Sequence, residues 1–191
     1  MVRLTRIYTR GGDTGETSLG NGVRVPKDSL RVSAIGDVDE TNATVGLARL
    51  HLAGQPGADP MLARVQDDLF DLGADLANPG EDFDNESALR ITEAQVRRLE
   101  VEIDTTNADL PALDSFVLPG GTPAAAQLHL ARTVARRAER TMTALATAEP
   151  VNPAALMYIN RVSDLFFVLS RALNAAEGGE VLWRPGQNRG E

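Results

Sequence analysis

The sequence predicts an all-α fold, an antiparallel bundle of five helices. Of its 191 residues 42% are hydrophobic but only 4% are aromatic, and alanine and leucine are abundant, which favours packed helices over a β-sandwich. Five segments are expected to be helices, and three of them carry apolar residues at spacings of three and four, the period of one helix face. No convincing strand-period pattern and no internal repeat is present. Five helices with short connections pack most simply as an antiparallel bundle.

The first two helices are expected over residues 33–52 and 60–77. In the first, Asp37 is expected to cap the helix and to complement its dipole, whereas Asp39, further along, is the better candidate for pairing with an arginine. The second helix carries a single apolar stripe at helical spacing. The residues of that stripe are Leu62, Val65, Leu69, Leu72 and Leu76.

The remaining three helices have recognisable ends. The third begins at Thr92, with Gln95 as its capping-box partner. The fourth covers residues 123–146 and starts with a proline, which suits a first helical turn. The fifth covers residues 153–176 and is closed by two glycines at 178–179.

The chain is expected to form a single domain over residues 1–191, in three parts. Residues 33–176 form the bundle, residues 1–32 an N-terminal segment and residues 177–191 a C-terminal tail. Neither end segment shows a helical pattern, and segments that cannot bury themselves locally often dock on a neighbour. We therefore expect a homo-oligomer.

Charge and composition exclude several classes of function. The net charge of −8 and a pI near 4.8 argue against broad nucleic-acid binding, which needs a basic face. The absence of cysteine excludes disulfides, thiolate metal sites and cysteine nucleophiles. No segment has the length and hydrophobicity of a membrane span, so we expect no membrane association and a cytoplasmic protein.

Histidine chemistry is equally restricted. His51 and His129 are the only two histidines, and neither lies three residues after a glutamate. That pattern excludes a bundle-type di-iron centre and a histidine-based zinc site. Both are expected to be packing or surface groups.

The fourth helix carries a row of arginines in the sequence HLARTVARRAERTM. Helical spacing places Arg132, Arg136 and Arg140 on one face with Glu139, while Arg137 turns partly away. Guanidinium groups in a row suit the oxygens of a polyphosphate, since each donates in bidentate fashion. The alternative is that these arginines only form salt bridges on a solvated face. If the row is considered without the other motifs, this alternative is favoured.

Three other stretches are candidates for ligand binding. Residues 7–20, IYTRGGDTGETSLG, are rich in the residue types that hold phosphate, and Lys27 follows, but the spacing is not that of a P-loop. Asn160 is an amide able to read the edge of a base. Phe116, before a Pro-Gly-Gly turn, either pins that loop to the bundle or forms an apolar wall over a flat ligand.

Together these stretches resemble the PduO-type ATP:cob(I)alamin adenosyltransferases. The family hallmark Tyr-Thr-Lys/Arg-Thr-Gly-Asp-x-Gly-x-Thr/Ser-Ser/Thr, then Pro-Lys, stands here as YTRGGDTGETS at 8–18 with Pro26-Lys27. GDVDETNATVG, FVLPGG, ARTVARRAER and YINRVSDLFF follow in the family's order, so the resemblance spans residues 7 to about 173. Gly11 stands where the family often has threonine, which removes a hydroxyl group but keeps the backbone amide.

The resemblance implies a five-helix bundle assembled as a homotrimer, with an ordered N-terminal ATP-binding segment and active sites between adjacent subunits. It implies an intersubunit salt bridge between Asp39 and Arg132, an aromatic at Phe116 on the lower face of the corrin ring, and catalytic roles for Arg136 and Phe116. The ATP-binding residues that it implies from one subunit are Thr9, Arg10, Gly11, Gly12, Asp13, Thr17, Ser18 and Lys27. Those implied from the next are Arg136, Arg137, Glu139, Arg140 and Asn160.

The implied reaction is attack of cob(I)alamin cobalt on the 5′ carbon of ATP, which expels triphosphate and gives adenosylcobalamin, with Mg²⁺ present. Preorganised cations then stabilise the leaving group, and the protein needs no nucleophile of its own. A reductase and an adenosylcobalamin-dependent acceptor enzyme are the implied partners. Two alternatives stay open: a non-catalytic ATP- and cobalamin-binding bundle that delivers cofactor to a client enzyme, and a structural helical adaptor. Trp183 is expected either to contact cobalamin or to pack.

Overall fold

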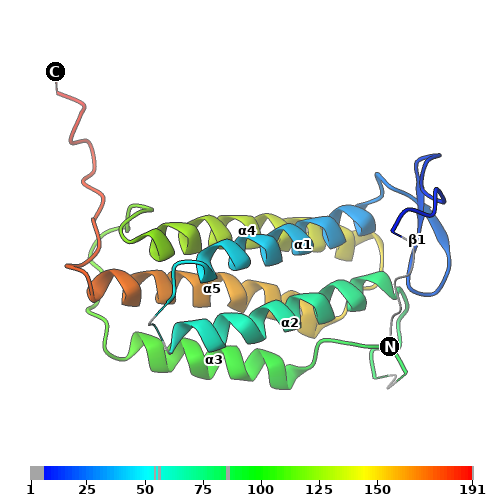
Figure 1. The fold of residues 1–191 in the computed structure, drawn as a ribbon, viewed down its shortest axis with the longest axis horizontal. Coiled ribbons are helices and arrows are strands. Elements are labelled where there is room, and N and C mark those ends of the chain that lie inside the picture. Colours follow the sequence, from blue (N-terminus) through cyan, green and yellow to red (C-terminus); the bar gives the residue numbers. More distant parts are fainter. Residues whose placement is uncertain (1–6, 54, 56, 85–86, 191) are drawn as a thin grey trace.

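The computed structural model describes residues 7–53, 55, 57–84 and 87–190, and it confirms a bundle of five helices in which successive helices run in opposite directions (Figure 1). Helix α4 packs on α1 and α5, α5 also packs on α3, and α1 on α2. A two-stranded hairpin precedes the bundle. The elements are β1 Glu16–Ser18, β2 Arg24–Pro26, α1 Leu30–Arg49, α2 Ala58–Ala77, α3 Glu93–Asn107, α4 Pro123–Ala148 and α5 Pro153–Ala175.

Helix α1 begins at Leu30, three residues earlier than expected. Ser29 has extended backbone geometry and its hydroxyl accepts a hydrogen bond from the backbone N–H of Val32, so it is the N-cap. The prediction that Asp37 caps this helix is therefore wrong. Asp37 lies two turns inside α1 and faces α4 instead, where its carboxylate accepts a 2.6 Å hydrogen bond from the Thr141 hydroxyl.

The other helix ends follow the sequence signals closely. Thr92 and Gln95 form the expected capping box at the start of α3. Thr122 caps α4, whose first residue is Pro123. After α5, Gly178 and Gly179 have φ values of 105° and 97°, a left-handed conformation that favours glycine and ends the helix.

The core is aliphatic, as the composition predicts. Every residue of the apolar stripe on α2 is at most 2% exposed. Tyr158 and Phe166 of α5 are fully buried beside it, and the Tyr158 hydroxyl donates a 2.8 Å hydrogen bond to the carboxylate of Asp68. A buried phenol with a partner keeps its polar group satisfied.

The hairpin was not predicted, because strands of three residues are too short to show an alternating pattern. Strands β1 and β2 pair antiparallel, with Thr17 opposite Val25. Gly20, between them, donates its backbone N–H to the carbonyl of Ala77 over 2.8 Å. This bond docks the hairpin at the C-terminal end of α2, one end of the bundle (Figure 1).

The C-terminal tail lies at the opposite end of the bundle (Figure 1). It pairs with the loop that precedes α4: Leu118 donates its N–H to the carbonyl of Val181 over 2.8 Å, and Trp183 donates to the carbonyl of Phe116 over 2.7 Å. No helix in the described part of the chain has the length and apolar character needed to cross a membrane.

Candidate functional site

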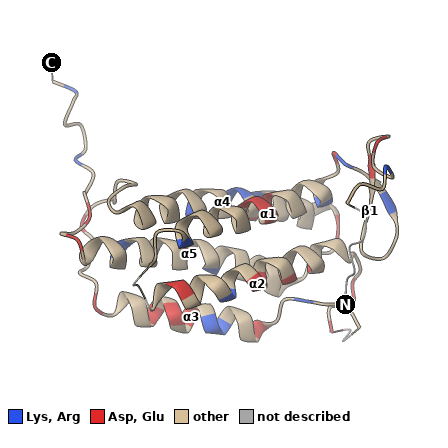
Figure 2. Ribbon diagram, viewed as in Figure 1, with Lys and Arg blue, Asp and Glu red and all other residues tan. Residues whose placement is uncertain are grey.

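The arginine row occupies the middle of α4, where Figure 2 shows the ribbon in the blue that marks Lys and Arg. Arg136 and Arg140 lie one turn apart and are exposed. Among the described residues, neither guanidinium group has a hydrogen-bond or salt-bridge partner. Two neighbouring, unneutralised cations on an acidic protein indicate a face that attracts an anion.

Glu139 and Asn160 are fixed next to these arginines, where α4 packs on α5. The Asn160 amide nitrogen donates to Glu139 over 2.8 Å, and its amide oxygen accepts from Arg161 over 2.5 Å. Arg161 in turn donates to Glu100 of α3 over 3.0 Å. Because both ends of the amide are engaged, its orientation is set before any ligand arrives.

Asp164, one turn after Asn160, was not among the predicted site residues, although it has the same helical spacing. Desolvation raises the pKa of its carboxyl group; Arg161 and Arg136 oppose this rise, and Glu139 adds to it. A carboxyl group with a raised pKa near an arginine such as Arg136, which has no partner among the described residues, is typical of a functional face.

Arg137 points away from the row, as the helical spacing predicts. Its guanidinium group pairs with Glu40 and, over 3.3 Å, with Asp37, both on α1. The hydrogen bond to Glu40 raises the pKa of Arg137 further above its ordinary range. The structure thus ties this predicted ATP ligand to α1 and does not bring it together with Arg136. Sequence reasoning missed this pairing, although Asp37 and Glu40 have the spacing of one helix face.

Arg132 and Asp39 do not pair with each other within one chain. The Arg132 guanidinium stands 6.0 Å from the centre of the Phe167 ring, and its buried Nε has no hydrogen-bond partner. Asp39 is exposed on α1 and pairs with nothing among the described residues. His129 is 2% exposed and packs against the same Phe167 ring, which confirms its expected packing role.

The predicted phosphate-binding residues of the N-terminal segment form an exposed loop and hairpin. The loop is held by Arg24, which donates to the carbonyl of Gly11 over 2.6 Å. The Lys27 ammonium nitrogen lies close to Gly12, 2.9 Å from where a Cβ atom at that position would stand. The remaining predicted residues here are Thr9, Arg10 and Asp13 in the loop, and Thr17 and Ser18 on β1.

Within one chain, the N-terminal segment and the arginine row do not meet. The hairpin docks beyond the end of the bundle, whereas the row occupies the middle of α4 (Figure 1). Between the described residues of the two regions there is no hydrogen bond or ion pair. The free arginines and the exposed loop therefore occupy separate regions of a single chain.

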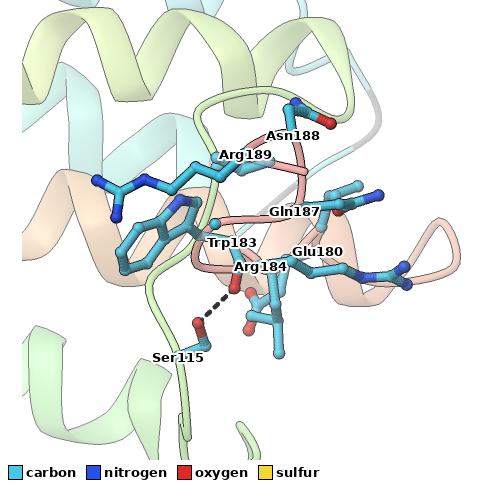
Figure 3. Close-up of a pocket in the computed structure, with 11 residues that line it drawn as sticks. Ser115, Glu180, Trp183, Arg184, Gln187, Asn188 and Arg189 are labelled. Atoms are coloured by element: carbon cyan, nitrogen blue, oxygen red, sulfur yellow. Dashed lines mark hydrogen bonds between the residues drawn. The ribbon is translucent and has the colours of Figure 1, made fainter. Parts of the chain in front are cut away.

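Phe116 and Trp183 form an aromatic surface at the other end of the bundle. The ring of Phe116 is 77% exposed, and the two ring centres lie 6.0 Å apart at an angle of 54°. Ser115 donates its hydroxyl to the carbonyl of Trp183 over 2.7 Å (Figure 3). The tail beyond Glu180 lines a cavity of about 1070 Å³ here, large enough for a bulky organic ligand.

Known proteins share both sequence and fold with this chain. The profile of the cobalamin adenosyltransferase family matches residues 7–173. A corrinoid adenosyltransferase of Mycobacterium leprae is 49% identical over 97% of this chain and 98% of its own length. One of Bacillus subtilis is 45% identical, over 92% of this chain and 91% of its own.

Solved structures agree with the sequence comparison. A phenylalanine-to-alanine variant of the PduO-type ATP:corrinoid adenosyltransferase from Lactobacillus reuteri, complexed with cobalamin and ATP, superposes with a TM-score of 0.84. It is 38% identical and covers 94% of this chain and 99% of its own. An arginine-to-lysine variant of that enzyme, complexed with ATP, gives 0.83 at 38% identity, over 93% of this chain and 100% of its own. This chain belongs to the cobalamin adenosyltransferase family.

Proposed function

We propose that this protein transfers the 5′-deoxyadenosyl group of ATP to the cobalt of cob(I)alamin and releases triphosphate. The observation that carries the proposal is the face of α4 and α5 on which Arg136 and Arg140, without partners among the residues that the structure describes, stand beside the fixed Asn160–Glu139 pair. Such a face suits a nucleoside triphosphate, because the arginines bind phosphate oxygens while the amide and carboxylate have fixed positions for polar groups of the nucleoside.

We propose further that each active site uses two subunits of a homotrimer. The exposed loop at residues 9–18, with Lys27, supplies one side of the triphosphate site, and Arg136, Arg140, Glu139 and Asn160 of the neighbour supply the other. The separation of these two halves within one chain supports this arrangement. Asp39 and Arg132, each without an ionic partner among the described residues, are the proposed intersubunit salt bridge.

The chemistry follows from the charges. The electron pair of cob(I)alamin cobalt forms the bond to the 5′ carbon as the carbon–oxygen bond breaks, and the departing triphosphate takes that bond's electrons. Negative charge therefore grows on the leaving oxygen, where preorganised guanidinium groups stabilise it more than they stabilise bound ATP. No proton is removed from the nucleophile, so the site needs no general base.

Mg²⁺ is proposed to arrive with ATP. Among the described residues, no group of three or more acidic or histidine side chains is placed to hold a metal ion. Mg²⁺ typically keeps several waters and is bound by substrate phosphates together with one or two carboxylates. Glu139, on the same face as the arginines, can supply one such carboxylate. When bound, the ion would neutralise part of the triphosphate charge.

Phe116 is proposed to face the lower side of the corrin ring, since its ring is exposed next to Trp183, a residue that lines a large cavity. An apolar group there displaces the lower axial ligand of cob(II)alamin, which makes reduction to cob(I)alamin easier. A one-electron reductase must then supply this site and an adenosylcobalamin-dependent enzyme must use its product. The proposed location of all three is the cytoplasm.

An anaerobic assay with ATP and chemically reduced cobalamin tests the reaction. Appearance of the adenosylcobalamin absorbance with one triphosphate released per corrinoid is the expected result. The competing function is a non-catalytic carrier that delivers cofactor, and tight binding of ATP and corrinoid without turnover would establish it instead.

Mixed oligomers test the shared site. Subunits with Lys27→Ala carry a damaged loop, and subunits with Arg136→Ala carry a damaged row. If a site combines two chains, random equal mixing restores about one quarter of the sites. About half of the sites receive an intact loop, and about half of these receive an intact row from the neighbouring subunit. A site built within one chain recovers no activity on mixing.

A further inference from the structure

Two polar side chains are buried near the C-terminal end of α5, on one face of the helix. Arg171 is 4% exposed and Asn174 is 2% exposed, and a spacing of three residues places them side by side. A buried guanidinium group is costly unless it is paired and hydrogen-bonded. The partners of these two residues therefore reveal what this end of α5 holds in place.

Arg171 joins the C-terminal tail to the loop before α4. Its Nε donates to both carboxylate oxygens of Glu180, over 3.0 and 3.1 Å, and its Nη2 donates to the carbonyl of Pro111 over 2.6 Å. The Glu180 side chain is itself only 14% exposed. One planar guanidinium group thus connects two segments that are about seventy residues apart in the sequence.

Asn174 holds the other end of the same loop. Its amide oxygen accepts from the N–H of Thr122 over 3.0 Å, and its amide nitrogen donates to the carbonyl of Gly120 over 3.1 Å. A Cβ atom at Gly121 would lie 2.1 Å from the Asn174 amide oxygen, so only glycine permits this contact. The loop from Pro111 to Thr122 is consequently attached to α5 at both ends.

Between these attachments the tail forms a short ladder with the loop. Immediately after Glu180, Val181 accepts from Leu118, and Trp183 donates to Phe116. The ladder brings the rings of Phe116 and Trp183 to 6.0 Å. Since the ladder is only three residues long, its register depends on where Glu180 is fixed.

We infer that Arg171 and Glu180 are positioning residues that fix the Phe116–Trp183 aromatic surface and thereby govern the corrinoid step without taking part in ATP binding. The inference about the corrinoid step rests on the proposed function; the positioning of the two rings does not. Loss of the Glu180 carboxylate leaves Arg171 buried with a carbonyl partner alone. Loss of the Arg171 fork leaves Glu180 no buried cation, so its carboxylate moves to water and the tail detaches from the loop.

The fluorescence of Trp183, the only tryptophan in the chain, reports the position of the tail directly. The variants are Glu180→Ala, Glu180→Gln and Arg171→Lys in the full chain, with far-UV circular dichroism to check the helices. Glu177→Gln is the matched control, because Glu177 is an exposed carboxylate three residues earlier with no side-chain partner among the described residues. The steady-state measurements use ATP and chemically reduced cobalamin.

We expect Glu180→Ala to shift Trp183 emission to longer wavelength and to increase its quenching by acrylamide, with helix content unchanged. The KM for cobalamin should rise by about tenfold or more while the KM for ATP stays within about twofold, a split that general damage to the fold would not give. Glu180→Gln and Arg171→Lys should show smaller changes in the same direction, and Glu177→Gln none.

Two results would overturn the inference: unchanged Trp183 emission in both Glu180→Ala and Arg171→Lys, or equal rises in the two KM values. If the unmodified protein lacks adenosyl transfer, the proposed function fails on its own account. Trp183 emission then still decides whether Arg171 and Glu180 position the aromatic surface.

Discussion

Asn160 of α5 donates a 2.8 Å hydrogen bond to Glu139 of α4, and this bond crosses the interface of the two helices that carry the anion-attracting face. Arg136 lies one turn before Arg140 on the same α4 face and has no partner among the described residues. The pairing therefore uses the local carboxylate to orient an amide and leaves the arginines free. Cations left unneutralised in this way are available to a phosphate ligand.

Replacement of Arg136 by alanine should lower kcat/KM by an amount equivalent to about 2 to 4 kcal/mol, as for other lost donors to a developing negative charge. The measurement is the initial rate of adenosylcobalamin formation at saturating cobalamin over a range of ATP concentrations, which gives kcat/KM for ATP. Arg97→Ala, an exposed arginine on α3, is the control and should leave the rate unchanged. Full activity of Arg136→Ala in intact oligomers would contradict the assigned role.

Replacement of Asn160 by alanine should raise the KM for ATP by about tenfold while kcat changes less. The reason is that the lost polar contact stabilises bound ATP and the transition state to a similar extent. Glu139 and Arg161 would each lose a partner, so the thermal stability of the variant must be measured in parallel. An unchanged KM for ATP would show that the amide does not contact the nucleotide.

Replacement of Phe116 by alanine should separate reduction from adenosyl transfer. Turnover that starts from cob(II)alamin with a reductant should fall severely, whereas turnover from chemically prepared cob(I)alamin should fall less, since the aromatic is assigned to the reduction step. Parallel assays from the two oxidation states make the comparison. Equal rates in the cob(II)alamin assay for variant and parent protein would refute this assignment.

Asp75 should be important for stability. This carboxylate is 3% exposed and accepts from Arg90 over 2.7 Å, from the N–H of Ile91 over 2.9 Å and from Asn152 over 2.7 Å. Asp75→Ala takes the carboxylate from the Arg90 guanidinium, which keeps only the carbonyls of residues 75 and 78, and leaves the N–H of Ile91 without its acceptor. Because this breaks a buried ion pair, the free energy of unfolding should fall by about 3 to 5 kcal/mol in urea denaturation. Glu93→Ala, which breaks an exposed pair on α3, should change it little.

His129 should make the protein less stable in acid. Desolvation lowers the pKa of its buried imidazole, and Arg132 lowers it further, while Glu180 has a weaker opposite effect. The folded protein therefore holds His129 neutral, whereas the unfolded chain binds a proton below about pH 6.5. The stabilising contribution is complete above that pH and is lost as the pH falls toward the folded-state pKa.

The variant His129→Leu should consequently lose less stability than the parent protein between pH 7.5 and 5, by at most about 1.4 kcal/mol per pH unit. Urea denaturation across this range measures the difference. His51→Gln is the control, since His51 is exposed and should leave the pH dependence as it is. Parallel pH profiles for His129→Leu and the parent protein would contradict a neutral buried imidazole.

Local sequence patterns were sufficient to predict the features that repeat along a helix. The apolar stripe from Leu62 to Leu76, the capping box at Thr92 and the common face of Arg136 and Arg140 all depend on the helical period, which is visible within a few residues. The five motifs in their order likewise indicated the family before any fold was known.

Contacts between groups that are distant in the sequence could not be predicted from such patterns. Arg137 pairs with Asp37 across 100 residues, so a predicted cap became an interhelical ion pair, and Arg171 joins Pro111 to Glu180. The hairpin at Thr17 and Val25 is too short to produce a strand pattern. The physical reason is the same in each case: periodicity reports which face of a helix a residue occupies, whereas its partner depends on how α1, α4 and α5 pack and on where the loops between them are attached.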